Sequence, residues 1–415
     1  MTPATTLAEE GKAWRLRKFW PHDLVLGLFP LLVGFEVLLW TVYLPLGTRG
    51  IADFRQFYTG GYMLRTGQAR HLYEDDKAVR LEEALVPVGA HFMLSVTHPA
   101  FEELMFVPLS LVTYRVAYWV FMVFNVALLI LCMELLRPRL SALSDRWKWV
   151  PSLLFAAFYP ISRTLTQGQD SIIMLAILVG TLVALDQGKE LTAGLLVGIG
   201  VFKFQIAIPI ALLFVLWRRW RFSVGFGISS SIASAVSLWI VGLDGAREYM
   251  GILFSMSARL SSRADIFRDP MTPNEMLNLR GVISAIFAGN LSPLWLQCVI
   301  FATSVVILLL AARQQPSLPL AITASSLISY HFIAHDATVL ILPVAIALCR
   351  RTVWVAAAAV PVLIAPIFAI VPAYGYLAAI PILVFFLATL GQMPEAREFT
   401  VGGRQNSMLR AHRCM

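Results

Sequence analysis

The sequence has 415 residues, of which 58% are hydrophobic and 14% charged, and its mean hydropathy is +0.72. Soluble domains carry roughly 25% charged residues, so this composition excludes an ordinary soluble protein. The net charge of +8 does not indicate nucleic-acid binding, because the basic residues gather in short loops between apolar runs, as the positive-inside rule predicts for a membrane protein.

The first part of the chain predicts one span and a long polar loop. Residues 1–23 form a basic tail, and the apolar run 24–44 is long enough to cross a bilayer of about 30 Å. The run is too long for the core of a signal peptide, so we interpret it as a retained span. The polar stretch 45–112 follows on the outer side, and its patterning predicts amphipathic helices over 54–65 and 75–86 along the membrane surface.

The middle of the chain predicts a hairpin inside the membrane. The stretch 191–217 is apolar except for Lys203 and Gln205. As a single crossing it would place the basic cluster that follows it on the outer side, against the positive-inside rule. We therefore predict two short helices that meet near Lys203 and return to the cytoplasmic side. The spans predicted before this hairpin are 114–136, 149–164 and 171–186.

The rest of the chain continues the alternation of spans and loops, with a second polar outer stretch over 243–292. The spans predicted here are 222–242, 293–312, 317–333, 338–349, 353–371 and 375–391. The predicted fold is therefore an all-α polytopic membrane protein, a bundle of about 11 to 12 spans or half-spans with short amphipathic helices in its outer loops. It forms a single transmembrane domain over 24–392, flanked by cytoplasmic tails at 1–23 and 393–415.

Several common signatures are missing from the sequence. There is no P-loop, no GxGxxG motif after a predicted strand, and no soluble stretch large enough to hold a nucleotide. We therefore expect no nucleotide-sugar or ATP chemistry on the cytoplasmic side and no cofactor. The cysteines show no paired spacing, so we predict neither disulfides nor a thiolate metal site; they are Cys132, Cys298, Cys349 and Cys414.

The unusual polar residues converge on the outer ends of the predicted spans. Asp53 lies just after the first span, between apolar residues and an aromatic cluster, where partial shielding from water can raise the basicity of its carboxylate. Lys203 points toward the same level from its hairpin, and ionisable groups inside a membrane are functional candidates. The other members are His98, Gln167, Gln169, Asp170, Asn278, Arg280, His331, His335 and Asp336.

This set suits the transfer of a sugar, which requires a base, cations that stabilise a leaving phosphate, and a pocket that hydrogen-bonds the sugar. We predict Asp53 as the base and Lys203 and Arg280 as the phosphate-binding cations. Tyr58 and His98 are predicted to line an acceptor pocket in the first outer loop. The remaining predicted ligands of the donor phosphate or sugar are Gln167, Gln169, Asn278, His331, His335 and Asp336.

Each of these residues also has an ordinary structural explanation. Asp53 can cap the helix that follows it, and Lys203 can reach the lipid surface or pair with Glu36. The segment Gln167-Gly168-Gln169 can be an interfacial turn, and Glu102-Glu103 favours an acidic pair at a helix N-terminus over an acid–base dyad.

The spacing of His331, His335 and Asp336 resembles a metal site. A His pair at a helix end more often forms hydrogen bonds or binds substrate when no third strong ligand is evident, so we predict no metal.

Several segments, in their order and spacing, resemble one family. The first outer loop resembles that of polyprenol-phosphate-sugar-dependent glycosyltransferases of the GT-C fold, and in particular the bacterial glycosyltransferase family 87, which includes polyprenol-phosphate-mannose-dependent mannosyltransferases. The segments that carry this resemblance are Asp53-Phe54, Tyr58, Gly67, Leu72-Tyr73, His98-Pro99 and Pro108-Leu109. Those that resemble the middle and later parts of the family are Gln167-Gly168-Gln169, Gly194, Gly198, Lys203 ahead of Trp217-Arg218-Arg219-Trp220, Asn278-Leu279-Arg280-Gly281 and Tyr330 to Asp336.

The resemblance covers roughly residues 50–350 and implies an inverting, metal-independent single displacement with Asp53 as the base. It implies transfer of a hexose, with mannose expected, from a polyprenyl-phosphate donor to a lipid or glycan acceptor at the periplasmic face of a bacterial inner membrane. Two positions depart from the family pattern. Thr59 stands where a second aromatic residue beside Tyr58 is expected, and the loop reads Thr97-His98-Pro99 where many members have an aromatic residue before the proline.

Two other functions fit a chain of this composition. A multi-span transporter or flippase would have two homologous halves, and we detect no internal repeat. An O-antigen-ligase-like enzyme typically carries its large loop late in the chain, whereas the longest loop here is the first one. Neither alternative accounts for the polar residues as well as a glycosyltransferase does.

Overall fold

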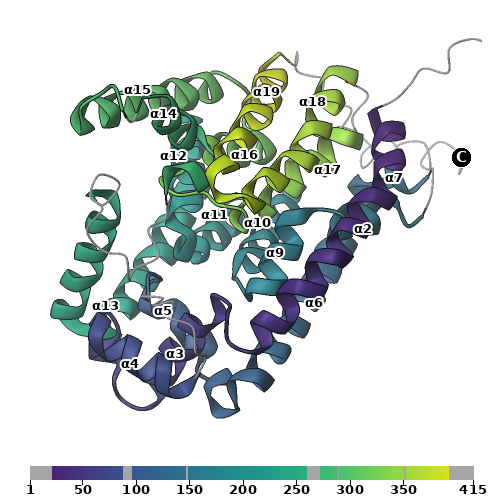
Figure 1. The fold of residues 1–415 in the computed structure, drawn as a ribbon. Helices are drawn as coiled ribbons and strands as arrows, with labels where there is room; N and C mark the ends of the chain where they lie inside the picture. The colour runs from purple at the N-terminus through teal and green to yellow at the C-terminus, as the bar shows by residue number, and fades with distance from the viewer. Residues whose placement is uncertain are drawn as a thin grey trace, which may run out of the picture.

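The computed structural model describes residues 21–86, 96–145, 148–258, 272–287, 289–349 and 352–391. The predicted tail 393–415, nearly all of the predicted tail 1–23 and the middle of the predicted outer stretch 243–292 lie outside these residues. In the described part of the chain the regular elements are helices, arranged as a bundle (Figure 1). The prediction of an all-α fold is confirmed.

Seven helical segments of the described chain are long and apolar enough to cross a membrane, although one of them, Glu190–Leu216, turns back at Lys203; three shorter apolar helices accompany them. The long segments are Gly27–Thr48, Tyr114–Arg139, Glu190–Leu216, Trp220–Phe254, Pro293–Ala312, Val353–Ile370 and Pro372–Leu390. The shorter ones are Ser171–Asp186, Leu318–Ile328 and Asp336–Cys349. Because large apolar side chains such as Trp239 (84% exposed) and Phe301 (71% exposed) point outward from these helices, the protein is a polytopic membrane protein.

The first helices lead to the end of the bundle that we call the site end, where α2 (Pro21–Thr48) finishes and α6 (Tyr114–Leu136) begins. The two predicted amphipathic helices form there as α3 (Phe54–Arg65) and α4 (Asp75–Leu85), followed by the short α5 (Ala100–Glu103). Most of α3 is buried, so this helix packs inside the first outer loop instead of lying open on the membrane surface.

The predicted hairpin is present. It consists of α11 (Glu190–Ile199), a 3₁₀ turn at Gly200–Lys203 and α12 (Phe204–Leu216). A straight helix over this segment would be about 40 Å long, yet Arg219 Nη1 lies 2.8 Å from Glu190 Oε1. The chain therefore reverses direction at Lys203, which reaches the level of the site end.

The predicted span 149–164 is divided into α8 (Val150–Ala156) and α9 (Tyr159–Gln167). Pro160 lies in the first turn of α9, and a proline there cannot continue a helix from the residues before it. The predicted span 317–333 ends early, as α16 (Leu318–Ile328), because the chain turns at the site end after Ile328.

The helix α13 (Trp220–Ala258) continues beyond residue 242, where a span was predicted to end. It bends at Gly242, whose φ is 72°, and the Tyr249 ring then packs 4.8 Å from the Tyr73 ring of the first outer loop. The beginning of the predicted outer stretch 243–292 is therefore helix that supports this loop.

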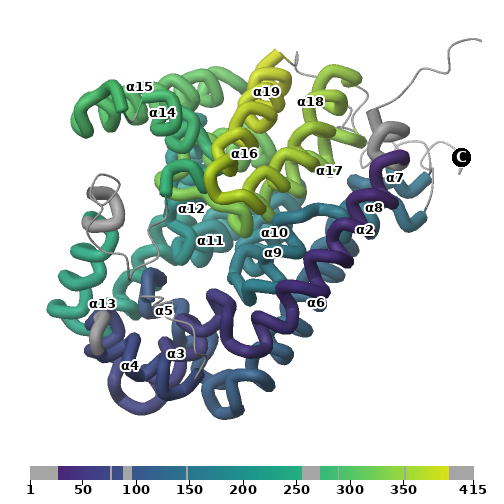
Figure 2. Tube along the Cα trace, in the orientation of Figure 1, coloured from purple at the N-terminus to yellow at the C-terminus, as the bar shows by residue number. Residues whose placement is uncertain are grey.

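The remaining helices complete the bundle around the hairpin. They are α7 (Ser141–Ser144), α10 (Ser171–Asp186), α14 (Leu279–Phe287), α15 (Pro293–Ala312), α17 (Ile341–Cys349), α18 (Val353–Ile364) and α19 (Ala379–Leu390). The helix α2, near the beginning of the chain, packs against α18, near its end (Figure 2). Segments far apart in the sequence therefore lie side by side in the bundle.

Candidate functional site

Asp53 lies in the turn between α2 and α3, and two glutamines from a distant part of the chain bind it. Gln169 Nε2 donates to Asp53 Oδ2 over 2.7 Å, and the Asp53 backbone N–H donates to Gln167 Oε1 over 3.2 Å. Asp53 precedes the first residue of α3, but its side chain makes no capping hydrogen bond. The helix-cap alternative is therefore wrong. The side chain is only partly buried, which leaves the carboxylate accessible to a further partner.

The turn between the two glutamines depends on glycine. Gly168 ends α9 in the left-handed region with φ 62°, a conformation that glycine adopts without steric cost. A Cβ at this position would lie 2.7 Å from Phe54 Cβ. The absence of a side chain at Gly168 therefore allows both glutamines to approach Asp53 together.

Asp170 connects this turn to a buried ion cluster. Lys203 Nζ lies 2.8 Å from Asp170 Oδ1 and 2.7 Å from Asp336 Oδ1. Lys203 is 2% exposed and the two aspartates are fully buried. The predicted alternatives for Lys203, the lipid surface or Glu36, are wrong, because in the described chain its acidic partners are these two aspartates.

His98 and Glu102 extend the cluster on one side. His98 Nδ1 lies 2.9 Å from Glu102 Oε2 and 3.7 Å from Asp170 Oδ2. Burial raises the pKa of Glu102 and of Glu103 well above the usual range of a carboxyl group, and neighbouring carboxylates add to the effect. Burial lowers the pKa of His98. On this side of the cluster, burial therefore favours the protonated carboxyls and the neutral imidazole.

His331 and His335 lie on the other side, next to Asp336. Their Nε2 atoms are 3.9 Å and 3.7 Å from Asp336 oxygens, which is too far for direct hydrogen bonds. Burial lowers the pKa of His331 to about 4 against the effect of Asp336. Burial also lowers the pKa of His335, and the carboxylates that oppose it are Asp336, Asp53 and Asp170. Asp53 and the ion cluster thus share one electrostatic neighbourhood.

Arg280 reaches the same turn from α14. Its Nη1 donates to the Tyr330 carbonyl oxygen over 3.1 Å, and its guanidinium carbon lies 4.5 Å from the centre of the Tyr330 ring. The Nε and Nη2 atoms are buried and have no hydrogen-bond partner in the described chain. Two unpartnered guanidinium nitrogens form a fork that suits a phosphate or carboxylate oxygen.

Two predicted ligands use their polar atoms within the protein. Asn278 Nδ2 donates to the Ser329 carbonyl over 2.7 Å, and its Oδ1 accepts from the Gly281 N–H over 3.1 Å. Tyr58 is buried, and its hydroxyl donates to the Val112 carbonyl over 2.7 Å. Asn278 therefore holds α14 against the turn after α16, and the Tyr58 hydroxyl is not brought beside the other predicted ligands.

In the described chain, one group of side chains could hold a metal ion. The sequence did not predict this group. Donor atoms of His98, Glu102 and Asp170 lie within 4.8 Å of one another. Glu102 lies in the first turn of α5, as its acidic pair suggested, but it is 2% exposed and binds His98. His98 precedes α5 and the extended Pro99, so only the short sequence separation of His98 and Glu102 was available as a signal.

A model of a protein family described as Glycosyltransferase family 87 matches residues 97–343. The matched range is more than half of the chain and contains the ion cluster, both histidines of the turn and Arg280, whereas Asp53 precedes it. No curated protein and no solved structure matches the sequence.

Proposed function

This chain belongs to glycosyltransferase family 87, and we propose that it transfers a hexose, with mannose as the first candidate, from a polyprenyl-phosphate donor to a lipid or glycan acceptor. The observation that carries the proposal is the hydrogen bond from Gln169 to Asp53. This bond fixes one carboxylate oxygen of Asp53 and leaves the other for an acceptor hydroxyl. A partly buried carboxylate held in this way suits a general base.

The proposed reaction is a single displacement. The acceptor hydroxyl gives its proton to the Asp53 carboxylate while its oxygen bonds to the anomeric carbon of the donor sugar. The bond from that carbon to the phosphate oxygen breaks, and polyprenyl phosphate leaves with the bonding electron pair. Because attack and departure occur on opposite faces of the carbon, the anomeric configuration is inverted.

We assign the leaving phosphate to Arg280. Its two unpartnered nitrogens lie beside the turn that carries His331, and the neutral histidines of that turn can hydrogen-bond the sugar or phosphate. Lys203 was expected to share this task. Since its ammonium group is held by Asp170 and Asp336, we propose that Lys203 neutralises these carboxylates so that they do not repel the phosphate.

We propose that the site end faces the periplasm of a bacterial inner membrane and that the termini are cytoplasmic. The support is the distribution of basic residues, because α6, α10 and α12 run from the site end toward loops rich in Lys and Arg. Those residues are Arg137, Arg139, Lys189, Arg218, Arg219 and Arg221.

Membership in a glycosyltransferase family argues against the transporter and flippase alternatives. The O-antigen-ligase-like alternative shares lipid-linked donors with our proposal, and donor assays distinguish the two, because such a ligase transfers a pyrophosphate-linked glycan instead of a phosphate-linked monosaccharide.

The test is transfer of labelled mannose from polyprenyl-phosphate-mannose by the purified protein in lipid, with EDTA present. We expect activity in the wild type and a loss of about 10²- to 10⁴-fold in Asp53→Asn. The matched control is Asp244→Asn, because the Asp244 side chain is 91% exposed. Equal activity in wild type and Asp53→Asn would remove Asp53 from the mechanism. Loss of activity on adding EDTA would contradict a metal-independent reaction and direct attention to His98, Glu102 and Asp170.

A further inference from the structure

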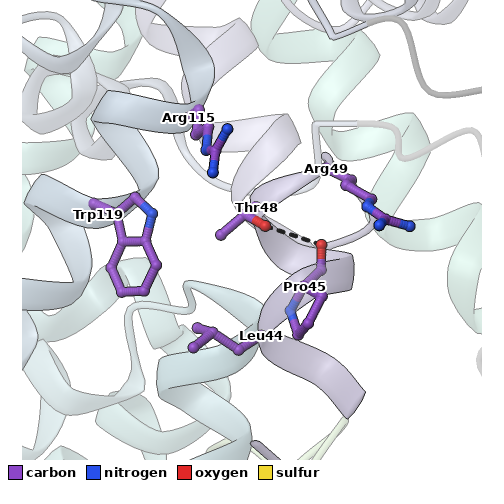
Figure 3. A pocket seen from close by; sticks show the side chains of 6 residues that line it. All are labelled: Leu44, Pro45, Thr48, Arg49, Arg115 and Trp119. Carbon is purple, nitrogen blue, oxygen red and sulfur yellow. Dashed lines mark hydrogen bonds between the residues drawn. The ribbon is translucent and has the colours of Figure 1, made fainter. Parts of the chain in front are cut away.

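A pocket of about 460 Å³ opens between the end of α2 and the start of α6 (Figure 3). Trp119 and Arg115 line it from α6, and Leu44, Pro45, Thr48 and Arg49 line it from α2 and the turn after it. The pocket therefore combines an apolar wall with two guanidinium groups at the level where the helices leave the membrane. The proposed mechanism uses none of these six residues.

The two arginines carry charge that the protein does not neutralise. Neither Arg49 nor Arg115 has an acidic or hydrogen-bonded side-chain partner in the described chain, and both are exposed. Elsewhere at the site end, Arg55 differs from them, because it pairs with Glu82 over 2.8 Å. Two arginines without an acidic partner that line one pocket favour an anion such as a phosphate.

The outward surfaces of α2 and α6 near the pocket are apolar. Large apolar side chains of α2 and α6 are exposed there, and they belong to Leu38 (61%), Val42 (52%), Val116 (48%), Val120 (48%) and Val123 (66%). A ligand with a phosphate head and hydrocarbon chains can thus contact the arginines with its head and this surface with its chains.

The inward face of α6 packs against the segment that carries Asp53, because Tyr114 and Tyr118 contact the Phe54 ring. Tyr114 and Tyr118 lie on that face, at most 7% exposed, and their hydroxyls donate to the carbonyls of Gly47 and Thr166 over 3.0 Å and 2.7 Å. Arg115 and Trp119 lie on the opposite, exposed face of α6, so we infer that a phosphate in this pocket lies outside the reaction centre and is not the leaving group there.

We propose that this pocket binds the headgroup phosphate of an anionic phospholipid of the surrounding leaflet, as an accessory lipid separate from the sugar donor. The bound lipid holds the end of α2 against α6, next to the turn that carries Asp53.

Native mass spectrometry of the protein released from membranes that contain phosphatidylglycerol tests the proposal. We expect the wild type to retain one phosphatidylglycerol more than the double variant Arg49→Gln, Arg115→Gln. The affinity of this variant should fall about tenfold or more, because neither glutamine can form a charge-assisted hydrogen bond with the phosphate. The matched control is Arg247→Gln, because Arg247 is exposed but pairs with Asp244; it should retain the lipid like the wild type. Equal retention in wild type and double variant would overturn the proposal.

A second measurement uses the wild type and does not depend on folding of the double variant. Brominated phosphatidylglycerol should quench the fluorescence of Trp119. The contribution of Trp119 to the total emission is the difference between the wild type and Trp119→Phe. Absence of this quenching overturns the proposal. Displacement of the lipid by inorganic phosphate would reveal a general anion site, and displacement by polyprenyl phosphate at equal concentration would reveal a donor site; either result also overturns it. None of these readouts measures sugar transfer, so they are independent of the proposed function.

Discussion

The carboxylate of Asp53 depends on one side chain for its orientation. Gln169 is 3% exposed and donates to Asp53 from the far side of the glycine turn. We predict that Gln169→Ala lowers kcat about 10²-fold with little change in KM, because a general base displaced by about 1 Å loses activity of this order. Steady-state transfer assays measure both constants. Gln187→Ala, at an exposed position after α10, should behave as the wild type. A change in KM alone would mean that Gln169 binds substrate and does not orient the base.

The protonation state of His331 can be tested through pH. Burial lowers its pKa to about 4, and an imidazole is deprotonated above its pKa, so His331 should be neutral throughout the range from about pH 5.5 to 8. We predict that His331→Gln lowers activity without changing the shape of the pH–rate profile in this range. The control is His71→Gln, because the His71 side chain is 44% exposed. If the acid side of the profile shifts or disappears in His331→Gln, this histidine titrates during catalysis and our assignment is incorrect.

At the scale of single residues, the sequence predicted that polar side chains gather at one end of the bundle but not which pairs they form. Asp53 and the two glutamines were identified because they are polar groups next to apolar runs. The partners of Lys203 could not be inferred, because they depend on which ends of α10, α12 and α17 meet in space. The burial of Glu102 was missed for the same reason.

At the scale of elements, the turn between α9 and α10 positions the site residues. Gly168 allows the backbone to form this turn. Gly188 provides a matched control, because its φ of 72° is also left-handed but a Cβ there would meet open space. Gly188→Ala should cost roughly 1–2 kcal/mol through the backbone alone. Gly168→Ala should cost more and also reduce activity, since its Cβ would displace Phe54 and the adjacent Asp53. Thermal unfolding in detergent and the transfer assay check this; equal effects of the two substitutions would show that Phe54 accommodates the methyl group.

The tip of the hairpin is held by the charges around Lys203. Lys203→Met leaves two buried carboxylates without a counter-charge, and we predict a loss of about 3–5 kcal/mol of stability. The triple variant Lys203→Met, Asp170→Asn, Asp336→Asn removes all three charges and should recover most of that stability. If Lys203 only neutralises the aspartates, the triple variant should also regain transfer activity. Stability without activity would show instead that Lys203 contacts the donor phosphate.

Helix boundaries were predicted best where an apolar run is uninterrupted. The predicted spans 114–136, 171–186 and 293–312 coincide with α6, α10 and α15. In these spans the bounds of the apolar run determine the bounds of the transmembrane helix. The hairpin was found from charge, since both of its flanks are basic or polar. The early end of α16 and the extension of α13 were not foreseen, because tertiary contacts at the site end determine them.

At the scale of the whole molecule, the proposed mechanism requires the site end to face the periplasm, where we propose that the lipid-linked donor is used. Single cysteines in a cysteine-free background test this orientation with a membrane-impermeant maleimide. Arg70→Cys lies at the site end and Lys189→Cys at the opposite end, and both positions are exposed. We predict that Arg70→Cys reacts in intact cells and that Lys189→Cys reacts only after the inner membrane is permeabilised. The reverse pattern would place Asp53 and Arg280 in the cytoplasm, where a polyprenyl-phosphate donor on the outer leaflet cannot reach them, and the proposed reaction could not proceed.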